Sequence, residues 1–124
     1  MTFSGIVNLG TAARTITVAS PQVTATISGQ LTSGAGSGLT KAGNGTLVLS
    51  GTGNDYTGAT IVSGGLLKYG AANAIPTGSA VTLQSGGTID INGGGTSVTL
   101  ASLAGDSAVQ GGLLTTSATT GTVT

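Results

Sequence analysis

The sequence has no cysteine, histidine or tryptophan, and only 5% of its 124 residues are charged. Without cysteine the chain can form neither a disulfide bridge nor a thiolate metal site. Its aromatic residues are two tyrosines and one phenylalanine. A globular domain of this size normally buries several aromatic side chains, because each removes a large apolar area from water. The core must therefore be built from Val, Ile, Leu and Ala, which suits a narrow interior.

The few charges cancel. The six charged residues are Arg14, Lys41, Lys68, Asp55, Asp90 and Asp106. Three scattered cations cannot neutralise a phosphate backbone, so we expect no nucleic-acid partner. A net charge of zero removes the repulsion between copies and favours self-association. No apolar run is long enough to span a bilayer, so we expect no membrane insertion. The chain does not open on a secretion signal, which we expect to be removed or to lie outside this sequence.

Short segments alternate apolar and polar residues with a period of two, which is the pattern of half-buried strands. These segments are Arg14–Val18, Val23–Ile27, Thr46–Leu49, Ala59–Val62, Gly65–Tyr69, Ala80–Leu83, Thr88–Ile91, Ser97–Leu100, Gly112–Thr115 and Gly121–Thr124. Turn signals separate them, such as Asn44-Gly45 and Asn92-Gly93-Gly94-Gly95, and no helical signal intervenes. The sequence therefore predicts an all-β protein.

The spacing of the strands indicates the architecture. Leu47, Leu67, Ile89 and Leu113 follow one another at intervals of 20, 22 and 24 residues, and Ala25 lies 22 residues before Leu47. The step continues about 20 residues further back, to Gly5-Ile6. Several strands per step predict a β-solenoid, here one domain over residues 1–124 with about six coils. The alternative is an antiparallel sandwich, which usually needs larger core residues to fill the space between its sheets.

Alternation predicts which side chains point inward. The inward set is Leu47, Leu49, Val62, Leu67, Val81, Leu83, Ile89, Ile91, Val98, Leu100 and Leu103. The outward set is Val48, Lys68, Thr82 and Asp90. We expect the glycines at the corners, where coils approach closely, and we expect Asn44, Asn54, Asn73 and Asn92 to cap main-chain groups in turns.

One stretch, Gly38–Lys68, carries a specific pattern. It reads GLTKAGNGTLVLSGTGNDYTGATIVSGGLLK. The spaced positions are Leu39, Lys41, Gly43, Gly45, Thr46, Leu47, Leu49, Gly51, Asn54, Tyr56, Thr57, Gly58, Thr60, Val62, Gly65 and Leu67. This stretch resembles the autotransporter-associated β-strand repeat, also called the passenger-associated transport repeat, and covers about a quarter of the chain. Residues 71–106 resemble the continuation of such passengers more loosely.

The resemblance implies a right-handed parallel β-helix that is secreted or displayed on a bacterial surface. In that family the repeat is associated with passenger secretion, and many passengers are adhesins or surface stalks. Leu66 departs from the pattern, which usually has a polar β-former there.

The residues offer little chemistry for an enzyme. The three aspartates lie in different sequence contexts, and no glutamate or histidine exists to act as acid or base. We therefore expect no enzymatic activity, no cofactor and no metal site, and we interpret the aspartates as solvated surface charges. Thr-x-Thr occurs at Thr15–Thr17, Thr24–Thr26 and Thr122–Thr124, but ice binding needs such motifs to recur at the coil step. Tyr56 could stack on a sugar if it were exposed, or pack on the Thr57-Gly58 corner.

The ends of the predicted rod favour self-association. Neither end carries an amphipathic helix, so we expect no terminal caps and unpaired edge strands. The residues expected to join copies are Thr2, Phe3, Ile6, Val7, Leu113, Leu114, Thr122 and Val123. A head-to-tail contact of this kind does not close and makes a filament. The sequence thus predicts a structural module whose partner is another copy of itself in an extracellular fibre. The alternative is a stalk segment of an adhesin passenger that binds glycans or surfaces.

Overall fold

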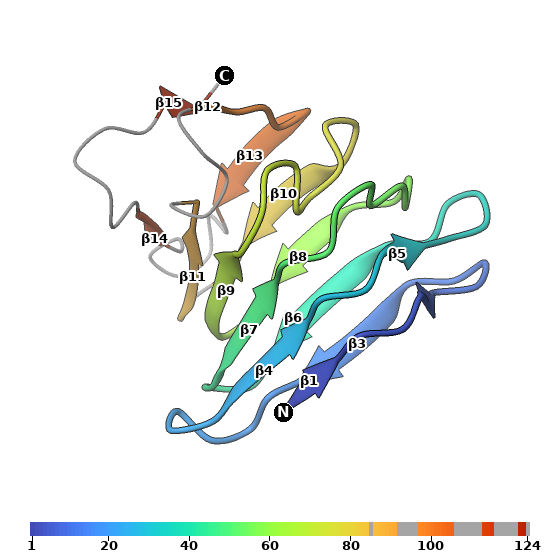
Figure 1. The fold of residues 1–124 in the computed structure, drawn as a ribbon. Coiled ribbons are helices and arrows are strands. Elements are labelled where there is room, and N and C mark those ends of the chain that lie inside the picture. The colour runs from blue at the N-terminus through green and yellow to red at the C-terminus, as the bar shows by residue number, and fades with distance from the viewer. Residues whose placement is uncertain (85, 92–96, 106–112, 116–121, 124) are drawn as a thin grey trace.

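The computed structural model is all-β, and it describes the chain except for residues 85, 92–96, 106–112, 116–121 and 124 (Figure 1). Short strands follow one another, and no helix occurs among the described residues. The strands are β1 (Thr2–Phe3), β2 (Val7–Asn8), β3 (Arg14–Thr17), β4 (Thr24–Ile27), β5 (Leu31–Thr32), β6 (Leu39–Ala42), β7 (Thr46–Leu49), β8 (Thr60–Val62), β9 (Gly65–Tyr69), β10 (Ala80–Leu83), β11 (Gly87–Asp90), β12 (Ser97–Val98), β13 (Ser102–Gly105), β14 (Leu113–Thr115) and β15 (Thr122–Val123).

The strands stack in parallel on the faces of a β-solenoid. One face is a six-stranded sheet in the order β1-β4-β7-β9-β11-β14, and a second is a five-stranded sheet in the order β13-β10-β8-β6-β3. Short pairs, β2-β5 and β12-β15, form a third face. All these pairings are parallel. The stack makes about four turns, which are the successive steps from β1 to β11 in the six-stranded sheet.

The register confirms the coil step that the sequence predicts. Ala25 pairs with Leu47, Leu47 with Leu67, and Leu67 with Ile89. Leu113 pairs with Thr88, so the prediction at that strand is one residue out of register. At the other end Gly5-Ile6 is the wrong site for the first strand, because Thr2 of β1 pairs with Thr26.

The core is a narrow column between the two large sheets, and most of its side chains are aliphatic. The expectation that Val, Ile, Leu and Ala alone build it is wrong, because Tyr56 and Tyr69 are its largest fully buried side chains. Leu47, Leu67 and Ile89 are fully buried, as alternation predicts. The rest of the predicted inward set is buried as well, with two exceptions. Leu103 is 40% exposed because β13 is the last strand of its sheet and no described strand stacks on it. The side chain of Val98 lies outside the described residues.

Asp90 lies in the outward row with Lys68, but the expectation that it is a solvated surface charge is wrong. Its side chain is only 8% exposed, and its Oδ2 lies 3.8 Å from Nζ of Lys68, its register partner on β9. The other register partner of Asp90 is Thr115 of β14, so the residue lies inside a row rather than at its end. Neighbouring coils on both sides leave little room for water.

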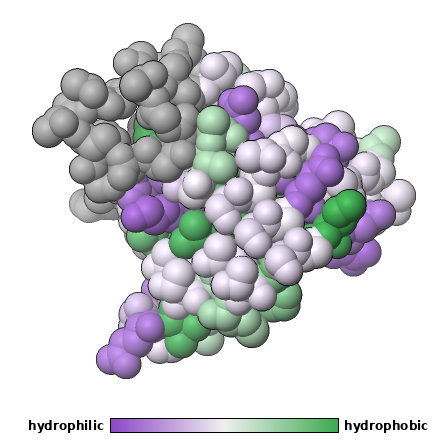
Figure 2. Space-filling view, in the orientation of Figure 1, coloured by the Kyte–Doolittle hydropathy of each residue, from purple (hydrophilic) through white to green (hydrophobic). Residues whose placement is uncertain are grey.

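The described surface is mostly uncharged. Figure 2 shows that residues of intermediate hydropathy cover most of one face, with only isolated hydrophilic and hydrophobic spots. This follows from the composition, since threonine, serine and glycine fill the outward positions. Among the described residues no helix could cross a membrane.

Candidate functional site

Lys41 is a fully buried lysine at the centre of the repeat. It sits in β6 between Ile16 of β3 and Val62 of β8, on the inward side of the sheet. Its Nζ donates hydrogen bonds to the carbonyl oxygens of Ala42 at 3.0 Å, Gly43 at 2.8 Å and Gly64 at 3.0 Å. An ammonium has three donors, so these carbonyls replace its water shell. Burial lowers the pKa of Lys41.

The lysine joins two coils at one corner, because Gly43 follows β6 and Gly64 precedes β9 one turn later. The backbone there is left-handed, with φ of +78° at Gly43 and +62° at Gly65. A Cβ at Gly65 would collide with the carbonyl oxygens of Gly45 and Gly43. The corner therefore needs glycine for both conformation and space. The predicted close approach of coils at these two glycines is confirmed.

Asn54 bridges three successive coils at the next corner. Its Oδ1 accepts a hydrogen bond from the Leu31 amide at 2.8 Å, and its Nδ2 donates to the carbonyls of Gly51 at 3.3 Å and Ala74 at 2.7 Å. The amide of Asp55 completes the contact by donating to the Leu31 carbonyl at 3.1 Å. The side chain thus stands in for a strand beside β5, and the predicted capping role of Asn54 is confirmed.

The remaining turn asparagines differ. Asn73 adopts φ of +54°, which fits an asparagine in a turn. Asn44 donates its main-chain amide to the Ala19 carbonyl at 3.3 Å, and a capping role for its side chain stays a prediction. Asn92 lies outside the described residues.

Tyr56 begins a chain of buried hydroxyl groups. Its phenol lies 2.7 Å from Thr60 Oγ1, and Thr60 Oγ1 lies 2.9 Å from Ser79 Oγ, which donates to the Gly58 carbonyl at 2.8 Å. Tyr56 is 1% exposed, and burial raises its pKa to about 12. A stacked sugar cannot reach a ring buried in this way. The sequence pattern alone did not reveal this chain, because its members are spread over two coils.

The other repeat positions fall into two groups, inward aliphatic side chains and corner residues. Thr57 is a corner residue whose Oγ1 accepts a hydrogen bond from the Gly36 amide one coil earlier, at 2.9 Å. The inward group is Leu39, Leu47, Leu49, Val62 and Leu67, and the other corner glycines are Gly45, Gly51 and Gly58. The structure thus brings the repeat residues together as a set of contacts between coils.

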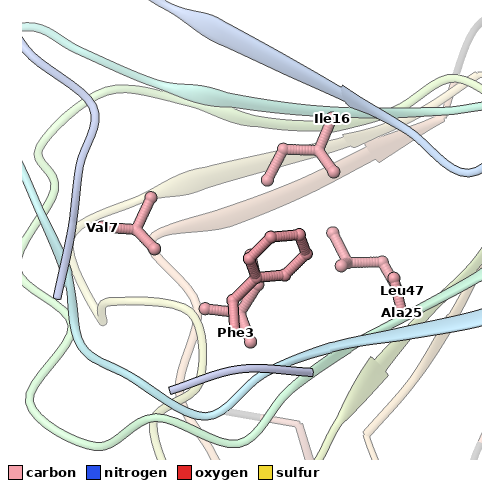
Figure 3. A pocket seen from close by; sticks show the side chains of 6 residues that line it. Phe3, Val7, Ile16, Ala25 and Leu47 are labelled. Atoms are coloured by element: carbon pink, nitrogen blue, oxygen red, sulfur yellow. The ribbon is translucent and has the colours of Figure 1, made fainter. Parts of the chain in front are cut away.

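The first coil leaves its core open. Phe3, Val7, Ile16, Ala25, Ile27 and Leu47 line an apolar hollow of about 170 Å³. Figure 3 shows the labelled side chains of β1, β2, β3, β4 and β7 converging on it. Phe3 is 47% exposed and Ile6, in the link between β1 and β2, is 71% exposed. Among the described strands β1, β2 and β3 each pair with one neighbour only, so one edge of each carries free main-chain groups.

The residues predicted to join copies lie toward opposite ends of the stack. Thr2 and Phe3 form β1, and Val7 belongs to β2. The pairs at the other end are Leu113 and Leu114 in β14, and Thr122 and Val123 in β15. β14 pairs with β11, and β15 with β12; the side chains of these two strands lie outside the described residues.

The aspartates do not come together as a catalytic or metal site. Asp55 is exposed in a corner loop, Asp90 is buried beside Lys68, and Asp106 lies outside the described residues. Nowhere in the described part of the chain do three His, Cys, Asp or Glu residues gather as metal ligands would. The first two Thr-x-Thr motifs lie in β3 and β4, which belong to different sheets, so they do not stack.

The comparison with protein families agrees with this geometry. Residues 39–68 match the family model of the passenger-associated-transport-repeat. This repeat implies an autotransporter passenger β-solenoid module. The match begins at Leu39, the first residue of β6, and ends at Lys68 in β9, so it spans the Lys41, Asn54 and Tyr56 contacts. No curated protein and no solved structure matches the chain.

Proposed function

We propose that the chain is a non-enzymatic structural module that assembles end to end into an extracellular fibre. The fold we propose in full is a single right-handed β-helix without terminal caps, whose six coils are counted as one for each of the six strands of the larger sheet. A secreted or cell-surface location is what the passenger repeat suggests. Such a module acts as a scaffold, because backbone hydrogen bonds run along the stack and aliphatic rows fill its interior.

The observation that carries the proposal is the open first coil. Its hollow is apolar, its edge strands present unpaired main-chain groups, and Phe3 and Ile6 lie exposed beside it. Burying this surface would remove apolar area from water, at roughly 25 cal/mol per Å². Edge strands of this kind usually carry protection against pairing, and β1 and β2 contain neither a charged residue nor proline. An added coil would complete both the sheets and the core.

The buried polar contacts of the repeat support a structural role over a catalytic one. Lys41, Asn54 and the Tyr56 hydroxyl are each bonded to groups of the protein itself. Groups occupied in this way have no free donor or acceptor turned toward a substrate. They hold neighbouring coils together, as a structural stack requires.

Negative-stain electron microscopy of the purified chain over a concentration series tests the proposal. Uniform thin filaments that lengthen with concentration are the expected result. Single small particles at every concentration would reject the fibre and favour a stalk segment of an adhesin passenger. A Phe3→Lys variant sharpens the test, because a charge beside the hollow should shorten filaments formed through this end. Thr52→Lys, which adds the same charge at an exposed position between β7 and β8, is the matched control and should leave the filament length unchanged.

A further inference from the structure

Arg14 occupies an unexpected place at the open end. It begins β3, the outermost strand of the five-stranded sheet, and pairs in register with Leu39, which is fully buried. The same row continues through Thr60 and Val81 to Leu103. Arg14 therefore lies on the inward row of the sheet, where the following coils carry buried Leu39, Thr60 and Val81.

The neighbouring residues agree with this placement. Ile16, two residues along β3, lies on the same side and lines the apolar hollow. Arg14 is exposed at this open edge, and its Nε donates to the Leu9 carbonyl of the same coil at 2.9 Å. An inward-pointing charge on an edge strand is a known way in which sheets resist pairing with another chain.

The structure also indicates which surface would meet Arg14. The exposed large hydrophobic residues among those described are Met1, Phe3, Ile6, Val23 and Leu103. Four of them lie in the first 23 residues, and Leu103 lies on β13, the opposite edge of the sheet that begins with β3. Because the stacked strands are parallel, β13 of one copy can lie beside β3 of the next without either copy turning over.

The register of such a joint follows from the row. Continuing it would place Leu103 of one copy opposite Arg14 of the next, and Gly105 opposite Ile16. A slip of one residue would turn the apolar face of the strand outward, and a slip of two would leave Arg14 on the inward face. Arg14 would thus be buried in any joint that keeps the apolar rows inside.

We infer that Arg14 is a gatekeeper, whose inward charge keeps the joint between the β3 end of one copy and the β13 end of another weak and reversible. The inference rests on the proposed end-to-end association and names the residue that weakens it. The described strand β13 carries no carboxylate, so it would desolvate the guanidinium without offering an ion-pair partner, and this opposes the joint that the rest of the hollow favours. The partner is a second copy of this chain.

Sedimentation velocity at about 0.15 M salt, over a concentration series, tests the gatekeeper. Arg14→Leu should associate at a concentration at least tenfold lower than the wild type, whereas Arg14→Lys, which keeps the charge, should stay near the wild type. Asp55→Leu is the control, because it introduces the same side chain and also removes a charge, but at an exposed corner. It should leave the concentration at which the protein associates unchanged. If Arg14→Leu does not fold, Arg14→Gln replaces it in this comparison, because it removes the charge and keeps a polar side chain.

The outcomes separate this inference from the fibre. If the wild type stays single while Arg14→Leu forms filaments, the gatekeeper stands and the wild-type fibre is rejected. If the wild type forms filaments and neither Arg14→Leu nor Arg14→Gln lowers the concentration, the gatekeeper is rejected and the fibre stands. Adding Leu103→Lys to Arg14→Leu should abolish the stronger association of the single variant. Stronger association that persists in the double variant would reject β13 as the partner surface.

Discussion

The ammonium of Lys41 lies 3.0 Å from the carbonyl oxygen of Gly64, a residue of the next coil. The charge is held by main-chain oxygens at the point where one turn passes into the next. A lysine buried among aliphatic rows is thus a link between coils, with its desolvation offset by three charge-assisted hydrogen bonds.

Replacing Lys41 should weaken the stack at this corner. Lys41→Met keeps the length and the apolar stem of the side chain but leaves the carbonyls of Gly43 and Gly64 without the ammonium donor, while the Ala42 carbonyl keeps the Val18 amide at 3.0 Å. We expect the free energy of unfolding to fall by about 3 kcal/mol, because buried polar groups without a partner cost about 1–3 kcal/mol each. Urea denaturation followed by circular dichroism measures the change. Thr40→Ala, on the outward side of the same strand, is the control, and an equal loss there would contradict the assignment.

Asn54 should control the opening of the neighbouring coil. Asn54→Ala removes the acceptor for the Leu31 amide and the donor for the Ala74 carbonyl. We expect a loss of about 1–3 kcal/mol, concentrated at these partners. Hydrogen exchange resolves it, since the Leu31 amide should lose protection by about tenfold or more.

A second variant separates the two roles of this side chain. Asn54→Asp keeps an acceptor for the Leu31 amide but places carboxylate oxygen toward the Ala74 carbonyl. It should preserve the protection of Leu31 better than Asn54→Ala does, while still lowering global stability. Equal protection of Leu31 in the wild type and in Asn54→Ala would show that the bridge contributes nothing.

The glycine corners allow conformation and space to be tested apart. Gly65→Ala meets both a left-handed backbone and carbonyl oxygens in its way, so we expect a loss above about 3 kcal/mol or failure to fold. Gly36 has φ of +80° but open space around a Cβ, and Gly36→Ala should cost only about 1–2 kcal/mol. Thermal unfolding compares them with Gly78→Ala, where space is open and φ is not left-handed. Similar losses at all three sites would refute the close approach of coils.

The regular part of the fold follows from the sequence. Strands such as β4, β7 and β10 alternate cleanly, and one row of aliphatic residues at the coil step sets the register from Ala25 to Ile89. The alternation is local and the aliphatic row is periodic, so both can be recognised in a single sequence. Inward and outward faces then follow from the pleat alone.

Other strands cannot be identified from the alternation of apolar and polar residues, because particular residues interrupt it. β6 reads Leu-Thr-Lys-Ala, and a charged residue at an inward position hides the alternation until its carbonyl partners are known. β5 has two residues and depends on the side chain of Asn54 from the next coil. Leu103 and Phe3 have inward patterns but lie exposed, because burial at an end depends on what stacks there.

The candidate site shows the same division. The repeat pattern marks Lys41, Asn54 and Tyr56 by type and spacing but does not show their contacts. Lys41 and Asn54 bond to residues of the next coil, and Tyr56 is linked to the next coil through Thr60 and Ser79. Arg14 begins the alternating segment Arg14–Val18, but that pattern does not show which residues of other coils lie beside it. Its importance appears only when the register places it in the row of Leu39 and Leu103.

Both tyrosines should resist ionisation in the folded protein. Burial raises the pKa of Tyr56 to about 12, and burial followed by the charge of Tyr56 raises that of Tyr69. Absorbance near 295 nm should therefore show almost no phenolate at pH 10–11 in native protein, whereas urea-unfolded protein should titrate near pH 10. Phenolate formation near pH 10 in the folded chain would contradict the buried hydroxyl chain.

The same shift predicts how stability depends on pH. Because the folded pKa of Tyr56 lies above the unfolded value, its protonated form is favoured in the folded state. Its contribution is complete below pH 10 and is lost as the pH rises toward and beyond 12, by about 3 kcal/mol for a shift of two pKa units. Tyr56→Phe cannot ionise, so its free energy of unfolding should fall less steeply than that of the wild type over this range. Parallel curves for the two proteins would mean that the Tyr56 hydroxyl already meets water in the native stack.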